Sequence, residues 1–264
     1  MTPKLSIRLE VLPGTSVAEQ VAGAKRFGFD AIALPGRFKD RWLPGLRECL
    51  ADSPLPMSSI SLGFRHSLLS PDPLRRRQCR DSLMELLDLC AELGAGMFNF
   101  PPCLSYDNPE RLSDRAECDA LLFEQLPALA DAARDRDVLF LLEPVNKYES
   151  DYLNSIEHAA NVSRKLNHPN LACTADFFHM QIEELRIDEA LSKAGNQVRH
   201  VHVAENTRVE PGPGSLQFRP GFKSLKDSGY TGFVEVECRY LSGPAETVLP
   251  RSAEYLRREW EAAV

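Results

Sequence analysis

The chain has 264 residues, of which 43% are hydrophobic and 26% charged, and its formal net charge is −7 at pH 7. This balance is that of an ordinary globular protein, and no apolar run approaches the roughly 20 residues that span a membrane. The only basic cluster, Arg75–Arg77, lies in a helical pattern, so general affinity for nucleic acid is not favoured.

The first residues and the cysteines indicate the compartment. The N-terminal stretch MTPKLSIRLEVL lacks the apolar core of a signal peptide and passes directly into a strand-like alternation. The seven cysteines are odd in number, scattered and never arranged as CxxC, which indicates reduced thiols rather than a disulfide framework or a zinc ribbon. We therefore expect a cytoplasmic protein that binds neither membranes nor nucleic acids.

Strand-like and helical segments alternate through the first half of the chain. A strand at Leu5–Leu12 precedes a helical pattern that Ser16 can cap and Gly28 can end. Three further strands are predicted at Ala31–Gly36, Met57–Phe64 and Gly96–Pro102, with long helices at Leu74–Leu93 and about Asp114–Arg134.

The second half continues the alternation. The nearly continuous apolar run Val138–Val145 is typical of a parallel strand buried on both faces. A helical pattern at Ser155–Leu166 follows, and the segments NLACTADF, VRHVHVAE and GFVEVECR supply three more strands. Eight strands in strict alternation with about eight helices, without a linker, predict a (β/α)8 TIM barrel as a single domain over residues 1–264. An open doubly wound sheet is the alternative, but no GxGxxG follows the first strand.

The seventh predicted strand, VRHVHV, has a polar face and a mainly apolar face. Because alternate side chains of a strand point the same way, His200 and His202 share one side, and Arg199, Val201 and Val203 share the other. A buried, hydrogen-bonded histidine pair would have the same pattern, so this strand alone does not establish a metal site.

Four consecutive strands carry polar groups near their carboxyl ends, namely Glu143, Asp176, His202 and Glu237. Function in a TIM barrel lies at this end of the strands, so we expect the four side chains to converge. Each carboxylate taken singly is more simply explained as a helix cap or a surface ion pair, whereas four in succession indicate a site. Three carboxylates and one imidazole suit Mn²⁺, Co²⁺ or Mg²⁺ better than Zn²⁺.

Several segments resemble the ketose 3-epimerases, the D-tagatose and D-allulose 3-epimerase group within the xylose-isomerase-like sugar isomerases and epimerases. LEPVNKYESDYLNSIEHA resembles their E-P-L-N-R-[FY]-E stretch, and ADFFHMQIEE resembles their D-T-F-H-M-N-I-E-E. HVHVAENTRVEPGPGSLQF resembles their histidine strand followed by E-x-x-R-x-x-P-G-x-G, and GYTGFVEVE is similar to the strand that ends in their last metal glutamate. The similarity covers most of Ser70–Arg239 and is weakest over the first 60 residues.

The resemblance implies the roles of individual residues. Glu143, Asp176, His202 and Glu237 would ligate one divalent ion, with Mn²⁺ expected first and Co²⁺ or Mg²⁺ as alternatives. A further three residues would bind a small sugar or keto-acid substrate: His179 near its carbonyl end, with Arg208 and Glu149 completing the pocket. The family often pairs through barrel faces, so the resemblance also implies a homo-oligomer.

The implied reaction is epimerisation at C3 of a ketose. A metal that bridges the C2 carbonyl and the C3 hydroxyl oxygens acidifies the C3 hydrogen, so that a carboxylate can remove it as a general base. The resulting cis-enediolate is planar at C3, and a carboxylate on the opposite face can return a proton with inverted configuration. Glu143 and Glu237 are the expected pair, in either role. His200 and Glu235, two residues before proposed ligands, are expected to support the ligands from behind.

Other activities of the superfamily use the same kind of site. An aldose–ketose or hydroxypyruvate-type isomerase differs in where the proton returns, and a dehydratase needs a leaving hydroxyl in the right place. The strand ends FNFPPC and ALPG depart from the family pattern on the far side of the pocket, which leaves the substrate open. An apurinic-site endonuclease would need a three-zinc cluster and a basic surface, and a non-catalytic sugar-binding barrel would have no need of both glutamates.

Overall fold

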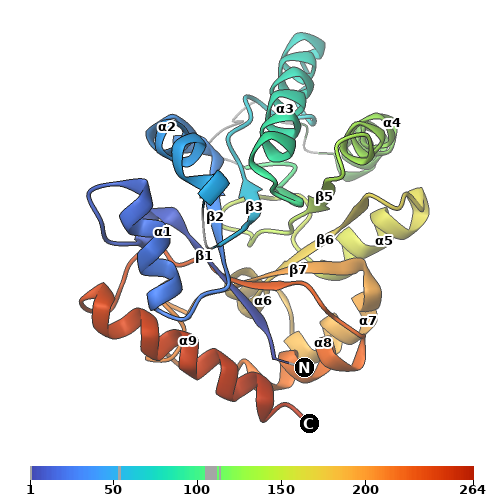
Figure 1. Cartoon of the computed structure of the whole chain (residues 1–264). Coiled ribbons are helices and arrows are strands. Elements are labelled where there is room, and N and C mark those ends of the chain that lie inside the picture. Colours follow the sequence, from blue (N-terminus) through green and yellow to red (C-terminus); the bar gives the residue numbers. More distant parts are fainter. Residues whose placement is uncertain (1, 53–54, 105–111, 113) are drawn as a thin grey trace.

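The computed structural model describes residues 2–52, 55–104, 112 and 114–264. Within them eight parallel strands pair in chain order and close into a barrel, with β8 beside β1 (Figure 1). The predicted (β/α)8 barrel is therefore confirmed. The strands are β1 Lys4–Arg8, β2 Ala31–Pro35, β3 Met57–Ser61, β4 Met97–Phe100, β5 Leu139–Leu142, β6 Leu171–Asp176, β7 Val198–Val203 and β8 Phe233–Val236.

Helices surround the strands, as Figure 1 shows. Among the described residues they are α1 Val17–Arg26, α2 Lys39–Cys49, α3 Pro73–Leu93, α4 Arg115–Arg134, α5 Ile156–Leu166, α6 Phe177–Glu183, α7 Ile187–Ala194, α8 Arg219–Asp227 and α9 Ala245–Glu261. Short 3-10 helices lie at Leu9–Val11, Gly36–Phe38, Leu50–Asp52 and Gly195–Gln197. No helix of the described ranges combines the length and the apolar character that a membrane crossing requires.

Local signals in the sequence account for several helix ends. The Ser16 side chain accepts a hydrogen bond from the backbone N–H of Glu19 and so caps α1, as predicted. Gly94 follows α3 in the left-handed conformation with φ of 67°, which glycine adopts without steric cost.

The strands are shorter than the apolar pattern predicts. The expected strand Leu5–Leu12 ends at Arg8, because Leu9–Val11 turn into a 3-10 helix whose Leu9 is still buried. The segment after β2 passes close to the segment after β3. A Cβ atom on Gly36 would lie 2.4 Å from the carbonyl oxygen of Leu62, so only glycine fits at position 36. Because these strands end early, loops surround the opening of the barrel at the carboxyl ends of the strands.

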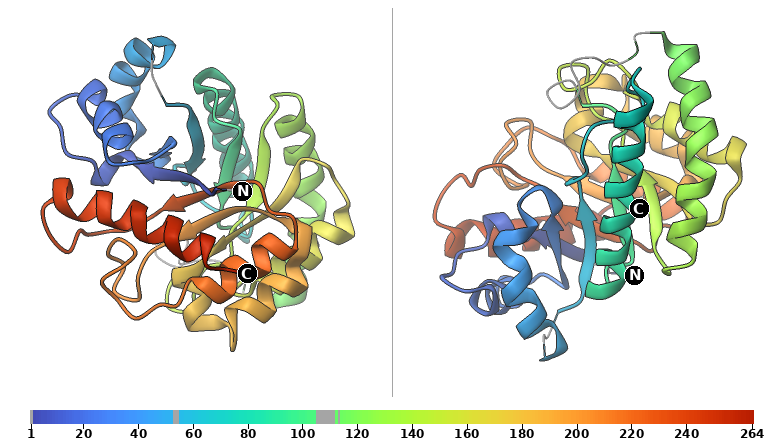
Figure 2. Two further views of the ribbon diagram at one scale, coloured as in Figure 1. Left: turned by 60° about the horizontal axis from the view of Figure 1, so that its bottom comes forward. Right: turned by 90° about the horizontal axis from the view of Figure 1, so that it is seen from above.

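The barrel interior is layered. Near the amino ends of the strands it is apolar, with Met97, Leu141 and Ala172 packed together. One step further along, the buried Asn99 and Thr174 hydrogen-bond to each other across the interior. Because side chains on one face recur every second residue, the next inward-facing positions lie at the carboxyl ends of the strands. Both chain termini lie at the opposite end of the barrel in Figures 1 and 2.

Candidate metal centre and substrate pocket

The four predicted metal ligands converge at the carboxyl ends of β5 to β8. One atom from each of Glu143, Asp176, His202 and Glu237 lies within 4.8 Å of the others, and all four side chains are buried. Glu143 directly follows β5, Asp176 ends β6, His202 lies in β7 and Glu237 directly follows β8. Residues far apart in the chain are thus brought together by the register of the barrel.

The contacts within this cluster suit a divalent cation. His202 Nδ1 lies 2.7 Å from Glu143 Oε1 and 3.4 Å from Glu237 Oε2. Asp176 Oδ1 accepts the backbone N–H of Phe178 and caps α6, while its buried Oδ2 has no hydrogen-bond partner in the structure. A buried carboxylate oxygen that forms no hydrogen bond with the described residues, beside two further carboxylates and a ring nitrogen, fits an ion that prefers oxygen ligands.

The electrostatics of the cluster reflect its burial. Burial raises the pKa of Asp176 to about 8, against the opposing charge of Arg208. Burial lowers the pKa of His202, but the carboxylates of Glu237 and Glu143 outweigh it and raise that pKa to about 10. For Glu237, burial raises the pKa, yet the charges of His202, Arg8 and Arg208 together hold it well below its usual range. The cluster therefore attracts positive charge strongly.

His179 lies beside the cluster with a defined tautomer. The backbone N–H of Asn146 donates to His179 Nδ1 at 3.2 Å, and the Asn146 side-chain amide lies 2.7 Å from the same atom. The ring proton is therefore assigned to Nε2, which lies 3.3 Å from Asp176 Oδ2 and 3.3 Å from Arg208 Nη1. Burial and the charge of Arg208 lower the pKa of His179 well below its usual value, so the ring is neutral.

Arg208 connects the metal cluster to the rim. Its guanidinium donates to Glu237 Oε2 at 3.0 Å and lies 3.9 Å from Glu149 Oε1 and 4.3 Å from the centre of the Phe178 ring. Its backbone φ is 59°, an uncommon value for a residue other than glycine. The structure thus places all three residues that were expected to bind substrate, His179, Arg208 and Glu149, around one space.

Two site residues were not predicted from the sequence. Arg8, at the end of β1, donates to Glu237 Oε1 and pairs with Glu10 at 3.2 Å, so each oxygen of Glu237 contacts a different arginine. Asn146 holds the ring of His179. The sequence held a signal for Arg8: it shares one face of β1 with Ser6, opposite the apolar Leu5 and Ile7, and an arginine that is buried is usually paired.

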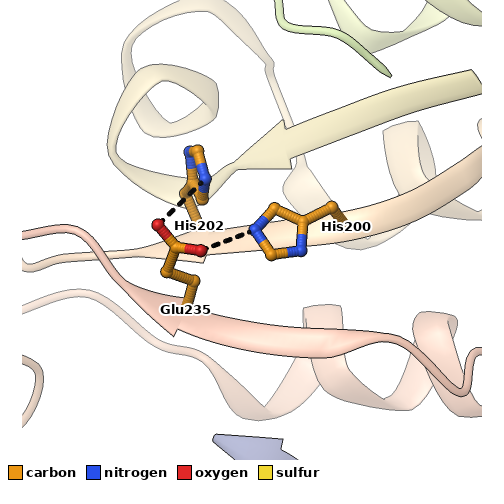
Figure 3. A group of neighbouring side chains, drawn as sticks. All are labelled: His200, His202 and Glu235. Atoms are coloured by element: carbon orange, nitrogen blue, oxygen red, sulfur yellow. Dashed lines mark hydrogen bonds and ion pairs between the residues drawn. The ribbon is translucent and has the colours of Figure 1, made fainter. Parts of the chain in front are cut away.

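A second buried group lies one layer below His202. His200 Nε2 lies 3.0 Å from Glu235 Oε2, and Ser59 Oγ donates to the same oxygen at 2.6 Å. The other oxygen of Glu235 lies 3.6 Å from His202 Nε2, so this carboxylate stands between the two imidazoles (Figure 3). The expected pairing of His200 with Glu235 is observed. These three residues are also close enough to surround an ion.

A cavity of about 440 Å³ opens above the cluster. Its lining includes Glu143, His179, Arg208 and Glu237, and on other sides Arg8, Glu10, Arg37, Phe38, Glu149 and Arg239. The volume is within the range of small-molecule sites, and the wall is rich in groups that hydrogen-bond to hydroxyl oxygens.

Comparison with known proteins agrees with this geometry. The chain is 27% identical to 3-dehydro-D-guloside 4-epimerase of Escherichia coli (strain K12), over 92% of this chain and 94% of the relative. It is 30% identical to ketose 3-epimerase of Arthrobacter globiformis, over 82% of this chain and 75% of the relative. The crystal structure of 3-keto-D-glucoside 4-epimerase from E. coli, in its apo form, has the same fold, with a TM-score of 0.86, 22% identity and coverage of 97% of this chain and 99% of the other.

These relatives confirm the resemblance to sugar epimerases that the sequence motifs indicated. The family model described as xylose isomerase-like TIM barrel matches residues 21–259, which is most of the chain. The protein therefore belongs to the xylose isomerase-like TIM barrel family.

Proposed function

We propose that the protein is a divalent-metal-dependent sugar epimerase of the isomerase class, which inverts the carbon next to a ketone in the manner of the ketose 3-epimerases among its relatives. One observation carries the proposal: Glu143 and Glu237, from strands on either side of His202 in the barrel, both approach its Nδ1 atom at the floor of a polar cavity. Two carboxylates around one position are what inversion by two proton transfers requires.

The proposed metal ligands are Glu143, Asp176, His202 and Glu237. A divalent cation there would polarise the substrate carbonyl and acidify the neighbouring C–H bond. The predominance of oxygen among the ligands favours Mn²⁺, with Co²⁺ or Mg²⁺ as alternatives.

The side chains around the metal site would carry out proton transfer and bind the substrate. One glutamate removes the proton from C3, and the other returns a proton to the opposite face of the planar enediolate, with either of Glu143 and Glu237 in either role. His179 Nε2–H and the Arg208 guanidinium would donate hydrogen bonds to substrate oxygens, and Glu149 would accept one at the rim. Because Arg8 and Arg208 hold the carboxylate of Glu237 from two sides, its position is set before the substrate arrives.

The test uses hydrogen exchange with solvent. Enzyme reconstituted with Mn²⁺ is incubated with ketoses in deuterated water, and incorporation of deuterium at C3 is followed by NMR. We expect Glu237→Gln to abolish exchange while the fold is retained, and Glu85→Gln, which changes a surface ion pair, to leave it intact. Undiminished exchange in Glu237→Gln, with metal content equal to that of wild type, would rule out the proposed role.

The same spectra separate the related activities. An aldose–ketose or hydroxypyruvate-type isomerase would place deuterium on the neighbouring carbon and yield an aldehyde, and a dehydratase would release water. A human relative named as a hydroxypyruvate isomerase is 29% identical over 72% of this chain, so hydroxypyruvate is tested together with the ketoses.

The proposal includes a cytoplasmic location and assembly into a homo-oligomer. The location is supported by the seven cysteines, all of which are free thiols in the structure. Light scattering on the purified protein tests the oligomeric state.

A further inference from the structure

A second cavity adjoins the one above the metal cluster. It measures about 480 Å³ and is lined by Glu10, Arg37, Phe38, Asp40, Arg41 and Trp42. Three of these, Glu10, Arg37 and Phe38, also line the cavity above the metal cluster. The two spaces therefore share a wall, and together they lead from Glu237 outward over the loops after β1 and β2 to the start of α2.

Phe38 presents an aromatic ring at the junction of the two cavities. It is the last residue of the 3-10 helix Gly36–Phe38, and its exposed fraction is 61%. Because this exposed ring lines both cavities, a ligand that extends from one into the other would cover it. The close fit of Gly36 against Leu62 fixes the backbone that carries the ring.

The charged groups that line the second cavity balance one another. Glu10 and Asp40 supply carboxylates, and Arg37 and Arg41 supply guanidinium groups. A site for an anion usually has more positive than negative side chains, and the lining of this cavity has two of each. The hydroxyl groups of a neutral sugar, in contrast, can bind hydrogen-bond donors and acceptors together. Trp42 forms a buried wall: its Nε1 donates to Gln20 Oε1 at 3.1 Å, and the Arg41 guanidinium lies 5.0 Å from its ring centre.

Glu10 links this cavity to the catalytic one. Its carboxylate pairs with Arg8, and Arg8 in turn donates to Glu237. A ring bound against Glu10 and Phe38 therefore lies next to the groups that hold the proposed acid–base pair.

We propose that this second cavity is a subsite for a second sugar ring, so that the preferred substrate is a keto sugar within a glycoside rather than a free monosaccharide. The proposal rests on the proposed function and names its substrate class. The glycosidic bond is neither made nor broken in an epimerisation, so the second ring contributes binding and orientation only.

Binding is tested first, with sugars that do not react. Cellobiose and D-glucose are titrated into the metal-loaded enzyme by calorimetry, and we expect the disaccharide to bind roughly tenfold more tightly. Phe38→Ala should remove most of this difference. Tyr240→Ala is the matched control, because Tyr240 follows β8, has a similar exposed fraction of 64% and is not among the residues that line either cavity.

The kinetic arm uses the corresponding keto sugars. The ratio of kcat/KM for 3-keto-cellobiose to that for 3-keto-glucose should exceed one and should fall roughly tenfold in Phe38→Ala but not in Tyr240→Ala. Solvent exchange is followed here at the carbons next to the ketone, because C3 of these sugars carries no hydrogen. Equal binding of cellobiose and glucose, or equal effects of the two variants, would overturn the subsite.

The two proposals fail separately. If no keto sugar undergoes exchange while cellobiose keeps an advantage that depends on Phe38, the subsite stands and the proposed epimerase activity falls. If the free keto sugar undergoes exchange but the disaccharide gains nothing, the activity stands and the subsite falls.

Discussion

His202 lies between carboxylates on both sides of its ring: Nδ1 is 2.7 Å from Glu143 Oε1, and Nε2 is 3.6 Å from Glu235 Oε1. Glu235 is itself fixed by Ser59 and His200. A carboxylate below Nε2 favours a proton on that atom, so that Nδ1, which faces the metal cluster, is the nitrogen that would lose its proton and bind a cation.

Glu235→Gln should therefore weaken metal binding, although Glu235 is not itself a proposed ligand. The amide keeps the size of the side chain but removes the charge that holds the proton on His202 Nε2. Loss of such outer partners lowers metal affinity by roughly tenfold to a hundredfold, which competition with a fluorescent chelator measures. Glu85→Gln is the surface control, and an affinity equal to wild type in a folded Glu235→Gln would show that Glu235 does not act through His202.

Much of the site could be predicted because its residues follow the periodicity of strands. His202 and Glu237 were found from the two-residue repeat of β7 and β8, and Glu143 from the end of an apolar run. Parallel pairing in a closed barrel then leaves little freedom in where these side chains meet. The motifs gave roles by similarity, and the contacts show that those residues do share one space.

What could not be predicted depends on long side chains and on loops. Arg8 lies at the end of a strand with buried neighbours, and the strand pattern alone does not show that its guanidinium pairs with Glu237, just after the adjacent strand β8. The end of β1 was placed too late because the apolar spacing continues through Leu9–Val11 while the backbone turns. The junction at Phe38 arises from a close approach of two loops, which is a tertiary contact without a sequence pattern.

Arg8→Gln should impair catalysis although Arg8 is no proposed ligand. The substitution removes the charged group that donates a hydrogen bond to the buried Glu237 Oε1. A hydrogen bond between charged groups contributes about 1.5–3 kcal/mol, so kcat/KM should fall roughly tenfold to a hundredfold. Arg8→Lys keeps the positive charge and should recover part of the loss. If Arg8→Gln has the activity of wild type, Arg208 alone is enough to hold Glu237.

Removal of the metal should lower thermal stability. The buried acids Glu143, Asp176 and Glu237 crowd one space, and a cation that binds only the folded state stabilises it by about 2.7 kcal/mol at a hundredfold excess over Kd. For a chain of this size, that corresponds to a rise in Tm of roughly 5–10 °C. Differential scanning fluorimetry with EDTA, Mn²⁺, Co²⁺ and Mg²⁺ measures it. No change in Tm with any of the three ions would contradict the metal site.

Buried thiols should make the fold sensitive to alkali. Burial raises the pKa of Cys79 from 9.0 to about 12, and that of Cys238 likewise to about 12. In the unfolded chain these thiols ionise at their ordinary pKa, while in the folded chain they stay protonated. A raised folded-state pKa means that the contribution to stability is complete below the unfolded pKa and is lost as the pH rises towards the folded one.

The free energy of unfolding should therefore decline as the pH rises above about 9, by about 1.4 kcal/mol per pH unit for each such thiol. Urea denaturation at a series of alkaline pH values measures the slope. Cys79→Ala should make the slope shallower, even though the lost packing lowers stability at every pH. Cys49, which is only partly buried, gives the matched variant Cys49→Ala, whose slope should stay closer to that of wild type. Equal slopes in wild type and Cys79→Ala would show that this thiol does not ionise on unfolding.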